Sequence, residues 1–121
     1  MTILTVDDDP AICHLVKTTL GMEGQILTAN SAKEAISVWQ SCQGKVDLLI
    51  TDVAMPEMNG MDLAKHLSAK DPGIAVLFMS GEWIAEVDEY ARAGFVAKPF
   101  KPDTLVGEVR KLMLVADRLA D

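Results

Sequence analysis

The stretch Leu48-Leu49-Ile50-Thr51-Asp52 strongly constrains how this chain can fold. Four apolar or β-branched residues in succession are typical of a central strand in a parallel sheet covered on both faces. A charge seldom ends such a run without a reason, because burying it unpaired is costly. We therefore expect Asp52 at the carboxyl end of a central strand, where open α/β sheets bind ligands. Taken alone, Asp52 fits a cap for the following helix or turn equally well.

Strand and helix patterns alternate along the chain, which predicts an α/β fold with a parallel sheet. The predicted strands are residues 1–6, 25–29, 46–52, 74–79 and 95–97. Four predicted helices cover residues 10–20, 31–44, 60–70 and 82–92, and the stripe of the last helix consists of Leu105, Val109, Leu112, Ala116 and Leu119. Pro10 suits the first turn of a helix, and Ser31 with Glu34 matches a capping box.

Size and charge exclude several classes of protein. With 121 residues, 50% of them hydrophobic, the chain can build one core and is too short for two ordinary domains. The net charge of −7 argues against direct nucleic-acid binding. No apolar run approaches the roughly 20 residues of a membrane helix, and no signal peptide is recognisable, so we expect a cytoplasmic protein. Cys13 and Cys42 lack metal-site or disulfide spacing and are expected to be small buried residues.

The informative polar residues all fall where a predicted strand ends. Asp7 and Asp8 follow the first strand, Asp52 ends the third, Ser80 follows the fourth and Lys98 follows the fifth. Because the carboxyl ends of parallel strands share one edge of the sheet, these side chains are expected to converge.

Such a cluster suits a metal ion and an anion. Like charges ~4 Å apart repel by roughly 4 kcal/mol at an effective dielectric near 20, so three carboxylates persist together only with cations or protons. An all-oxygen site fits Mg²⁺, which shares its coordination shell with phosphate oxygens. Lys98 and Ser80 add donors for an anion beside the metal. This combination predicts phosphoryl chemistry, with Asp52 as the nucleophile.

The ordered motifs resemble the receiver domain of two-component response regulators over essentially all 121 residues. They are Val6-Asp7-Asp8-Asp9, Thr51-Asp52 with Met55-Pro56, Asn59-Gly60, Met79-Ser80-Gly81 and Lys98-Pro99-Phe100. The resemblance implies a doubly wound, flavodoxin-like five-stranded parallel sheet of order 2-1-3-4-5 with five helices, the first and last on one face. Cys13 and Cys42 would then lie on different faces. A single receiver domain over residues 1–121, without an output domain, is expected.

The resemblance also implies a ligand set. Asp52 would accept a phosphoryl group from the phosphohistidine of a sensor histidine kinase or a phosphotransfer protein. Asp8 would ligate Mg²⁺ directly and Asp7 through water, and Asp52 and the backbone carbonyl of Ala54 would complete the protein ligands.

A switch is implied as well. Lys98 would pair with the phosphate, Ser80 would move towards it, and Phe95 would be the aromatic switch residue. The Lys98-Pro99 bond is often cis in the family. A downstream protein or a linked output domain would read the change. The domain would catalyse only its own phosphorylation and slow dephosphorylation and would not be an enzyme for external substrates.

This sequence departs from the family pattern in two ways. Between Ser80 and Lys98 it is about four residues shorter, which shortens or reshapes the region of the fourth helix and fifth strand. That region often mediates dimerisation, so the resemblance implies no oligomeric state here. Ala54 and Glu82 occupy positions that influence phosphate loss in the family, which leaves the phosphate lifetime open. Aromatic residues Trp83 and Tyr90 fit either partner contacts or packing against the sheet.

Three other classes of protein share part of this pattern. A haloacid-dehalogenase-like phosphatase also uses a strand-end aspartate and Mg²⁺, but it usually carries a second aspartate two residues on, where this chain has Ala54. A flavodoxin-like flavin binder needs a phosphate loop rich in Thr, Ser and Gly after the first strand, and Asp7-Asp8-Asp9 would repel that phosphate. A phosphate-independent interaction domain that keeps only the fold remains the third alternative.

Overall fold

The computed structural model describes the backbone of residues 1–90 and 92–120 and the side chains of residues 1–90 and 92–114. Its five parallel strands are β1 (Thr2–Val6), β2 (Gln25–Ala29), β3 (Leu48–Asp52), β4 (Ala75–Ser80) and β5 (Ala93–Ala97). The helices are α1 (Pro10–Leu20), α2 (Ala32–Ser41), α3 (Gly60–Lys70), the short 3-10 helix η1 (Ala85–Glu89) and α4 (Pro102–Ala120). Among the described residues, no helix combines the length and apolarity needed to cross a membrane.

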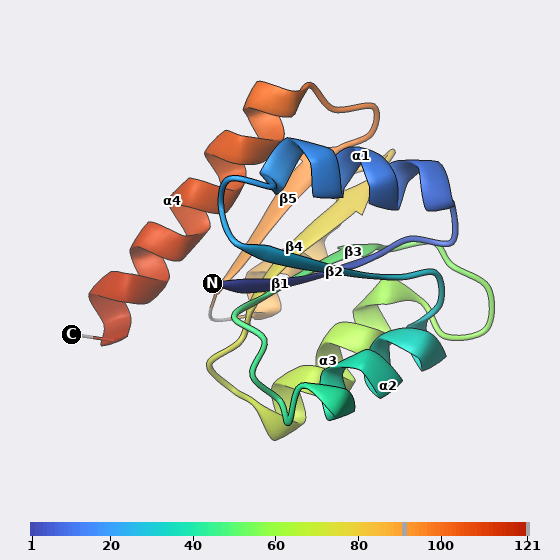
Figure 1. Ribbon diagram of the computed structural model, residues 1–121, viewed down its shortest axis with the longest axis horizontal. Coiled ribbons are helices and arrows are strands. Elements are labelled where there is room, and N and C mark those ends of the chain that lie inside the picture. Colours follow the sequence, from blue (N-terminus) through green and yellow to red (C-terminus); the bar gives the residue numbers. More distant parts are fainter. Residues whose placement is uncertain (91, 121) are drawn as a thin grey trace.

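The strand order is β2-β1-β3-β4-β5, which confirms the predicted doubly wound sheet. Helices α1 and α4 cover one face, and α2 and α3 cover the other (Figure 1). Strand β3 is buried along its whole length because it lies between β1 and β4 and under helices on both faces. The predicted central strand ending at Asp52 is therefore confirmed, and it begins at Leu48 rather than at residue 46.

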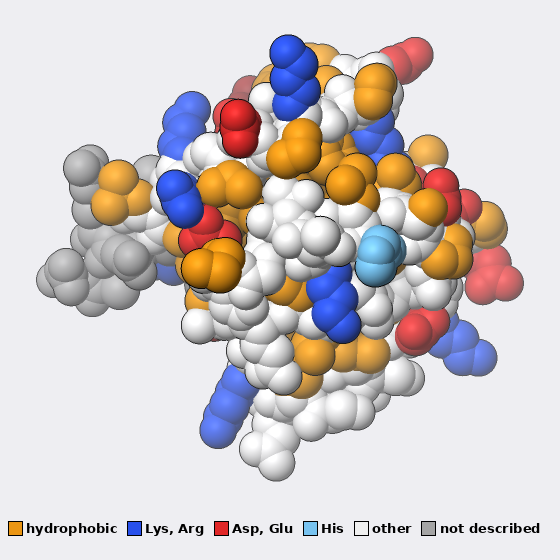
Figure 2. Space-filling view, turned by 45° about the horizontal axis from the view of Figure 1, so that its top comes forward, with side chains coloured by type: hydrophobic (Ala, Val, Ile, Leu, Met, Phe, Trp, Pro, Cys, Tyr) orange, Lys and Arg blue, Asp and Glu red, His pale blue; other side chains and the backbone are white. Residues whose placement is uncertain are grey.

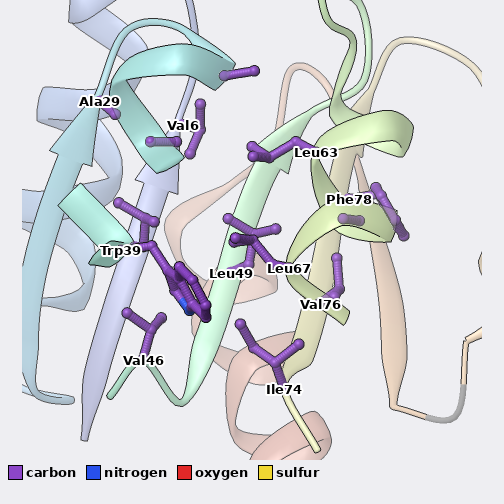
Figure 3. Close-up of a cluster of buried hydrophobic side chains, with 14 of the residues drawn as sticks. Val6, Ala29, Trp39, Val46, Leu49, Leu63, Leu67, Ile74, Val76 and Phe78 are labelled. Carbon is purple, nitrogen blue, oxygen red and sulfur yellow. The ribbon is translucent and has the colours of Figure 1, made fainter. Parts of the chain in front are cut away.

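Each face of the sheet has its own apolar core. On the side of α2 and α3, Trp39 reaches across the end of the sheet towards Val46 and Leu49, and Leu63 and Leu67 pack over β3 and β4 (Figure 3). The opposite core is formed by the apolar faces of α1 and α4 against β1, β3 and β4. Cys13 lies in α1 and Cys42 follows α2, so the two free cysteines are on different faces, as expected.

The helix starts follow the signals in the sequence. Pro10 occupies the first turn of α1, and the Asp9 carboxylate accepts from the Ala11 N–H at 2.9 Å. The Ser31 hydroxyl accepts from the Glu34 N–H at 3.0 Å, and Asn59 caps α3 in the same way. Such caps satisfy N–H groups that have no partner inside the helix.

The predicted helix over residues 82–92 is wrong. Among the described residues, only the 3-10 helix η1 forms there, between the extended residues Ile84 and Tyr90, and there are four α-helices rather than the five expected. Ala91 lies outside the described residues. Only residues 81–92 join β4 to β5, whereas the connections that contain α1, α2 and α3 are residues 7–24, 30–47 and 53–74. The β4–β5 connection therefore has too few residues for both an α-helix of the predicted length and the turns that would join it to the two strands.

The fifth strand is longer than the prediction of residues 95–97, because Ala93 and Gly94 also pair with β4. Because the connection from β4 is short, Ala93 and Gly94 belong to the sheet and not to a helix. The apolar stripe of the last helix is confirmed for Leu105, Val109 and Leu112, which are buried. The predicted stripe residues Ala116 and Leu119 lie outside the described side chains.

Candidate functional site

Three carboxylates meet at the carboxyl edge of the sheet. In the register of the neighbouring strands β1 and β3, Val6 lies beside Thr51, so the next residues, Asp7 and Asp52, leave the sheet together. Each of Asp7, Asp8 and Asp52 offers an oxygen within 4.8 Å of the others. Asp7 and Asp52 are buried, and Asp8 is exposed to solvent. The predicted convergence of the three acidic side chains at this edge of the sheet is therefore confirmed.

Lys98 supplies a positive charge to this cluster. It follows β5, and its Nζ lies 2.6 Å from Asp7 Oδ2 and 3.3 Å from Asp52 Oδ1. The Lys98 N–H also donates to the Ser80 carbonyl oxygen at 2.8 Å, and the Lys98-Pro99 peptide bond is cis. One ammonium group cannot neutralise three carboxylates, so the site retains an excess of negative charge.

Burial and the neighbouring charges together shift the pKa values of Asp52 and Lys98. Burial raises the pKa of Asp52, the charge of Asp7 raises it further, and Lys98 opposes both effects. Burial alone would lower the pKa of Lys98, but its hydrogen bond to Asp7 and the two carboxylate charges outweigh burial and raise that pKa. Lys98 therefore stays protonated at neutral pH. The ionised form of Asp52 is unfavourable in this environment, and an added cation would stabilise it.

The cluster fits a hard divalent cation. Its donors are all oxygens, and two of its three carboxylates are buried, so a cation would compensate charges that water cannot reach. Acidic side chains also gather on the right-hand side of the face in Figure 2, the side to which the strands point in Figure 1. Ala54, proposed from the sequence to offer its carbonyl, is exposed in the loop that follows β3.

The remaining predicted residues lie along β4 and β5. Ser80 ends β4, and its hydroxyl accepts from the Glu82 N–H at 3.2 Å. Phe95 is half-buried in β5, and the edge of its ring meets Trp83 with ring centroids 5.2 Å apart. Trp83 itself is 63% exposed.

The two aromatic residues flanking η1 have different environments. Tyr90 packs on Phe78 with ring centroids 5.4 Å apart, and its hydroxyl donates to the Met61 carbonyl oxygen at 3.3 Å. Burial raises the pKa of this hydroxyl. Packing against the sheet thus accounts for Tyr90, whereas the ring of Trp83 is largely open to solvent.

Two residues beside the site were not singled out from the sequence for these contacts. Asn30, at the end of β2, donates from its side chain to the Asp7 carbonyl oxygen at 3.0 Å. Gly60, the first residue of α3, comes so close to the Asp52 carbonyl oxygen that a Cβ there would collide with it. Asn59-Gly60 signals a helix start, but no local pattern shows that α3 begins against the end of β3.

A doubly wound parallel sheet of this order, with an acidic cluster and a lysine at its carboxyl edge, defines a CheY-like α/β domain. The family model described as "Response regulator receiver domain" matches residues 3–110, and this chain belongs to that family.

Known proteins agree with this assignment. The chain is 33% identical over 119 residues to the probable transcriptional regulatory protein TcrX of Mycobacterium tuberculosis, covering 93% of this chain and 50% of TcrX. The chemotaxis protein CheY4 of Vibrio cholerae superposes with a TM-score of 0.82 at 28% identity, covering 92% of this chain and 97% of that one. This chain spans about half the length of TcrX.

The response regulator protein TrrA of Thermotoga maritima, solved in complex with Mg(2+)-BeF, is 31% identical to this chain. It superposes with a TM-score of 0.79, covering 92% of this chain and 97% of that one. Together with the acidic cluster, this neighbour is consistent with divalent metal binding in receiver domains.

Proposed function

We propose that this domain is a phosphorylation switch in which Asp52 accepts a phosphoryl group from the phosphohistidine of a sensor histidine kinase or a phosphotransfer protein. The observation that carries the proposal is the position of Asp52, which ends a buried strand within reach of two further carboxylates and 3.3 Å from Lys98. An Asp52 oxygen attacks phosphorus, the P–N bond to the histidine ring breaks as the P–O bond forms, and the ring nitrogen retains the electron pair.

The other residues neutralise and position charge. Asp7, Asp8, Asp52 and the Ala54 carbonyl would hold Mg²⁺, which when bound neutralises charge on the phosphoryl oxygens. The raised pKa of Lys98 keeps its ammonium group protonated. This group leaves Asp7 and binds a phosphoryl oxygen. A nucleophile of this kind needs no external base, because Asp52 reacts as the carboxylate.

The signal is the rearrangement that follows. The phosphoryl group brings roughly −1.5 to −2 charge and strong acceptors. Ser80 gives up the Glu82 N–H and turns its hydroxyl towards the new oxygens, and Phe95 repacks beside it. A downstream protein or a linked output domain reads this change in the cytoplasm, where its kinase acts. The domain is no enzyme for external substrates, since Ala54 offers no acid or base two residues after the nucleophile.

Intact-mass analysis after incubation with acetyl phosphate tests the proposal. The wild-type protein is expected to gain one phosphoryl group in the presence of Mg²⁺ and none in EDTA. Asp52→Asn keeps the shape of the side chain but replaces the nucleophilic carboxylate oxygen, so it is expected to gain none.

The matched control is Asp62→Asn, which removes an exposed carboxylate from the first turn of α3 and is expected to label like the wild type. Labelling of Asp52→Asn to the wild-type extent would place the acceptor elsewhere. An unlabelled wild type, in conditions where another receiver domain labels, would favour a phosphate-independent interaction domain.

Trp83 offers an optical measurement of the switch. Trp39 is 9% exposed in the core, so a Trp39→Phe variant leaves the fluorescence of Trp83 alone. Because Trp83 meets the ring of Phe95, we expect its emission to change when acetyl phosphate and Mg²⁺ are added. The same addition should change nothing in Trp39→Phe/Asp52→Asn. Unchanged Trp83 emission in a protein shown by mass to be phosphorylated would contradict the role of Phe95.

A further inference from the structure

The connection from β1 to α1, which carries the acidic pair, lies beside the connection from β2 to α2 (Figure 1). Asn30 Nδ2 in the second connection donates to the Asp7 carbonyl oxygen at 3.0 Å. The same nitrogen contacts Cys13 Sγ at 3.7 Å. Both contacts lie directly behind the carboxylate cluster, and the Asp7 carbonyl oxygen is the stronger acceptor because a thiol sulfur accepts only weakly.

Asn30 is itself held by the first turn of α2. Its backbone N–H donates to Glu34 Oε2 at 3.3 Å, and the Glu34 N–H donates to the Ser31 hydroxyl at 3.0 Å. The Asn30 backbone is thus fixed by the Glu34 carboxylate, a bond in which the Ser31 hydroxyl takes no part, while its side-chain amide bonds the backbone of Asp7. A residue that served only the turn would need no bond to Asp7, which lies 23 positions away in the sequence.

The only other side chain that approaches the Asp7 carbonyl oxygen in the described hydrogen bonds is Cys13. Its buried Sγ lies 3.6 Å from that oxygen and 3.5 Å from the Ala29 carbonyl oxygen. Burial raises the pKa of this thiol, so it remains a weak donor shared between two carbonyls. Asn30 therefore makes the strong side-chain bond to this carbonyl.

We propose that Asn30 is a positioning residue for the acidic pair: by holding the Asp7 backbone it keeps the carboxylates of Asp7 and Asp8 directed at Asp52. The proposal rests on the proposed function, because it concerns the cation site. Three like charges within 4.8 Å tend to spread the loop that carries two of them. A bond that resists this spreading prepares the site for a cation, since the ligands need not be gathered at the moment of binding.

Binding of Mn²⁺ alone, measured from the electron paramagnetic resonance signal of the free ion, tests this inference without any phosphoryl transfer. Mn²⁺ prefers the same oxygen donors as Mg²⁺. Asn30→Ala is expected to bind about tenfold more weakly than the wild type, at the low end of what partners of metal-ligating groups contribute. The matched control is Ser31→Ala, which removes the cap of α2 one residue away but leaves the amide on Asp7, and it should bind like the wild type.

Reaction of Cys13 with a maleimide gives a second measurement, in a Cys42→Ser background so that one thiol reacts. Loss of the Asn30 amide should speed the reaction several-fold, because that amide contacts the buried sulfur, whereas Ser31→Ala should not. Thermal unfolding of both variants establishes that they are folded at the temperature used.

The outcomes separate the inference from the proposed function. Weaker Mn²⁺ binding and faster Cys13 alkylation in Asn30→Ala alone support the inference. Equal Mn²⁺ affinity in Asn30→Ala and the wild type, or equal weakening in Ser31→Ala, overturns the inference and leaves the proposed function standing. A wild-type protein that binds no Mn²⁺ overturns the cation site itself and the inference with it.

Discussion

Gly60→Ala is expected to lower the free energy of unfolding by about 3 kcal/mol, at the upper end of overpacking effects. The Cβ of residue 60 would collide with the carbonyl oxygen of Asp52 and lie 2.9 Å from Thr51 Oγ1. A backbone carbonyl at the end of a buried strand cannot rotate away as a flexible side chain can. Either α3 or the end of β3 must move, and the second movement also displaces the carboxylate of Asp52.

Urea unfolding of Gly60→Ala, compared with that of Gly107→Ala, tests this prediction. Gly107 lies exposed in α4, with no atom within 4 Å of an added Cβ, so the same substitution should be neutral or stabilise by roughly 0.5–1 kcal/mol. Unfolding midpoints that shift equally in the two variants would show that α3 does not press against β3 as described.

Lys98→Met is expected to lower the free energy of unfolding by about 2 kcal/mol at neutral pH in EDTA. Methionine keeps much of the length of the side chain but leaves Asp7 and Asp52 without their ammonium partner. Removing one partner of a fully buried ion pair costs roughly 3–5 kcal/mol, and the smaller value here reflects the 23% exposure of the Lys98 side chain.

The loss of stability caused by Lys98→Met should depend on pH. The raised pKa of Asp52 means that the folded protein binds this proton more tightly than the unfolded chain does, so ionised Asp52 opposes folding at neutral pH. Without Lys98, which lowers that pKa, the opposition grows. As pH falls through the folded pKa of Asp52, the carboxylate is protonated and the opposition disappears. The difference between Lys98→Met and the wild type should therefore shrink as pH falls from neutral towards the ordinary range of aspartate.

Lys101→Met is the matched control, because Lys101 is an exposed lysine three residues further on and its loss should change stability by less than about 0.5 kcal/mol at any of these pH values. Urea unfolding as a function of pH measures all three proteins. A Lys98→Met deficit that stays constant or widens as pH falls would mean that Asp52 does not titrate against Lys98.

The helix predicted for residues 82–92 shows where local sequence patterns mislead. Residues 82–92 contain good helix formers, yet only η1 forms there. Whether an α-helix forms depends on how many residues the connection offers for the helix and its two turns, and this is set by the residue at which β5 begins to pair with β4. That residue is Ala93, so Ala93 and Gly94 belong to β5.

The sequence by itself determined the alternation of strands and helices apart from the helix predicted for residues 82–92, the central position of residues 48–52 and the meeting of Asp7, Asp8, Asp52 and Lys98 at one edge. These follow because apolar runs must be buried and parallel strands end on the same side. Only the tertiary structure decided which neighbours hold those groups. The bond from Asn30 to Asp7, the approach of Gly60 to Asp52 and the contact of Trp83 with Phe95 join elements that are adjacent only once helices pack on the sheet. Spacing along a chain predicts periodic faces, whereas contacts of this kind depend on distances between elements that no local pattern encodes.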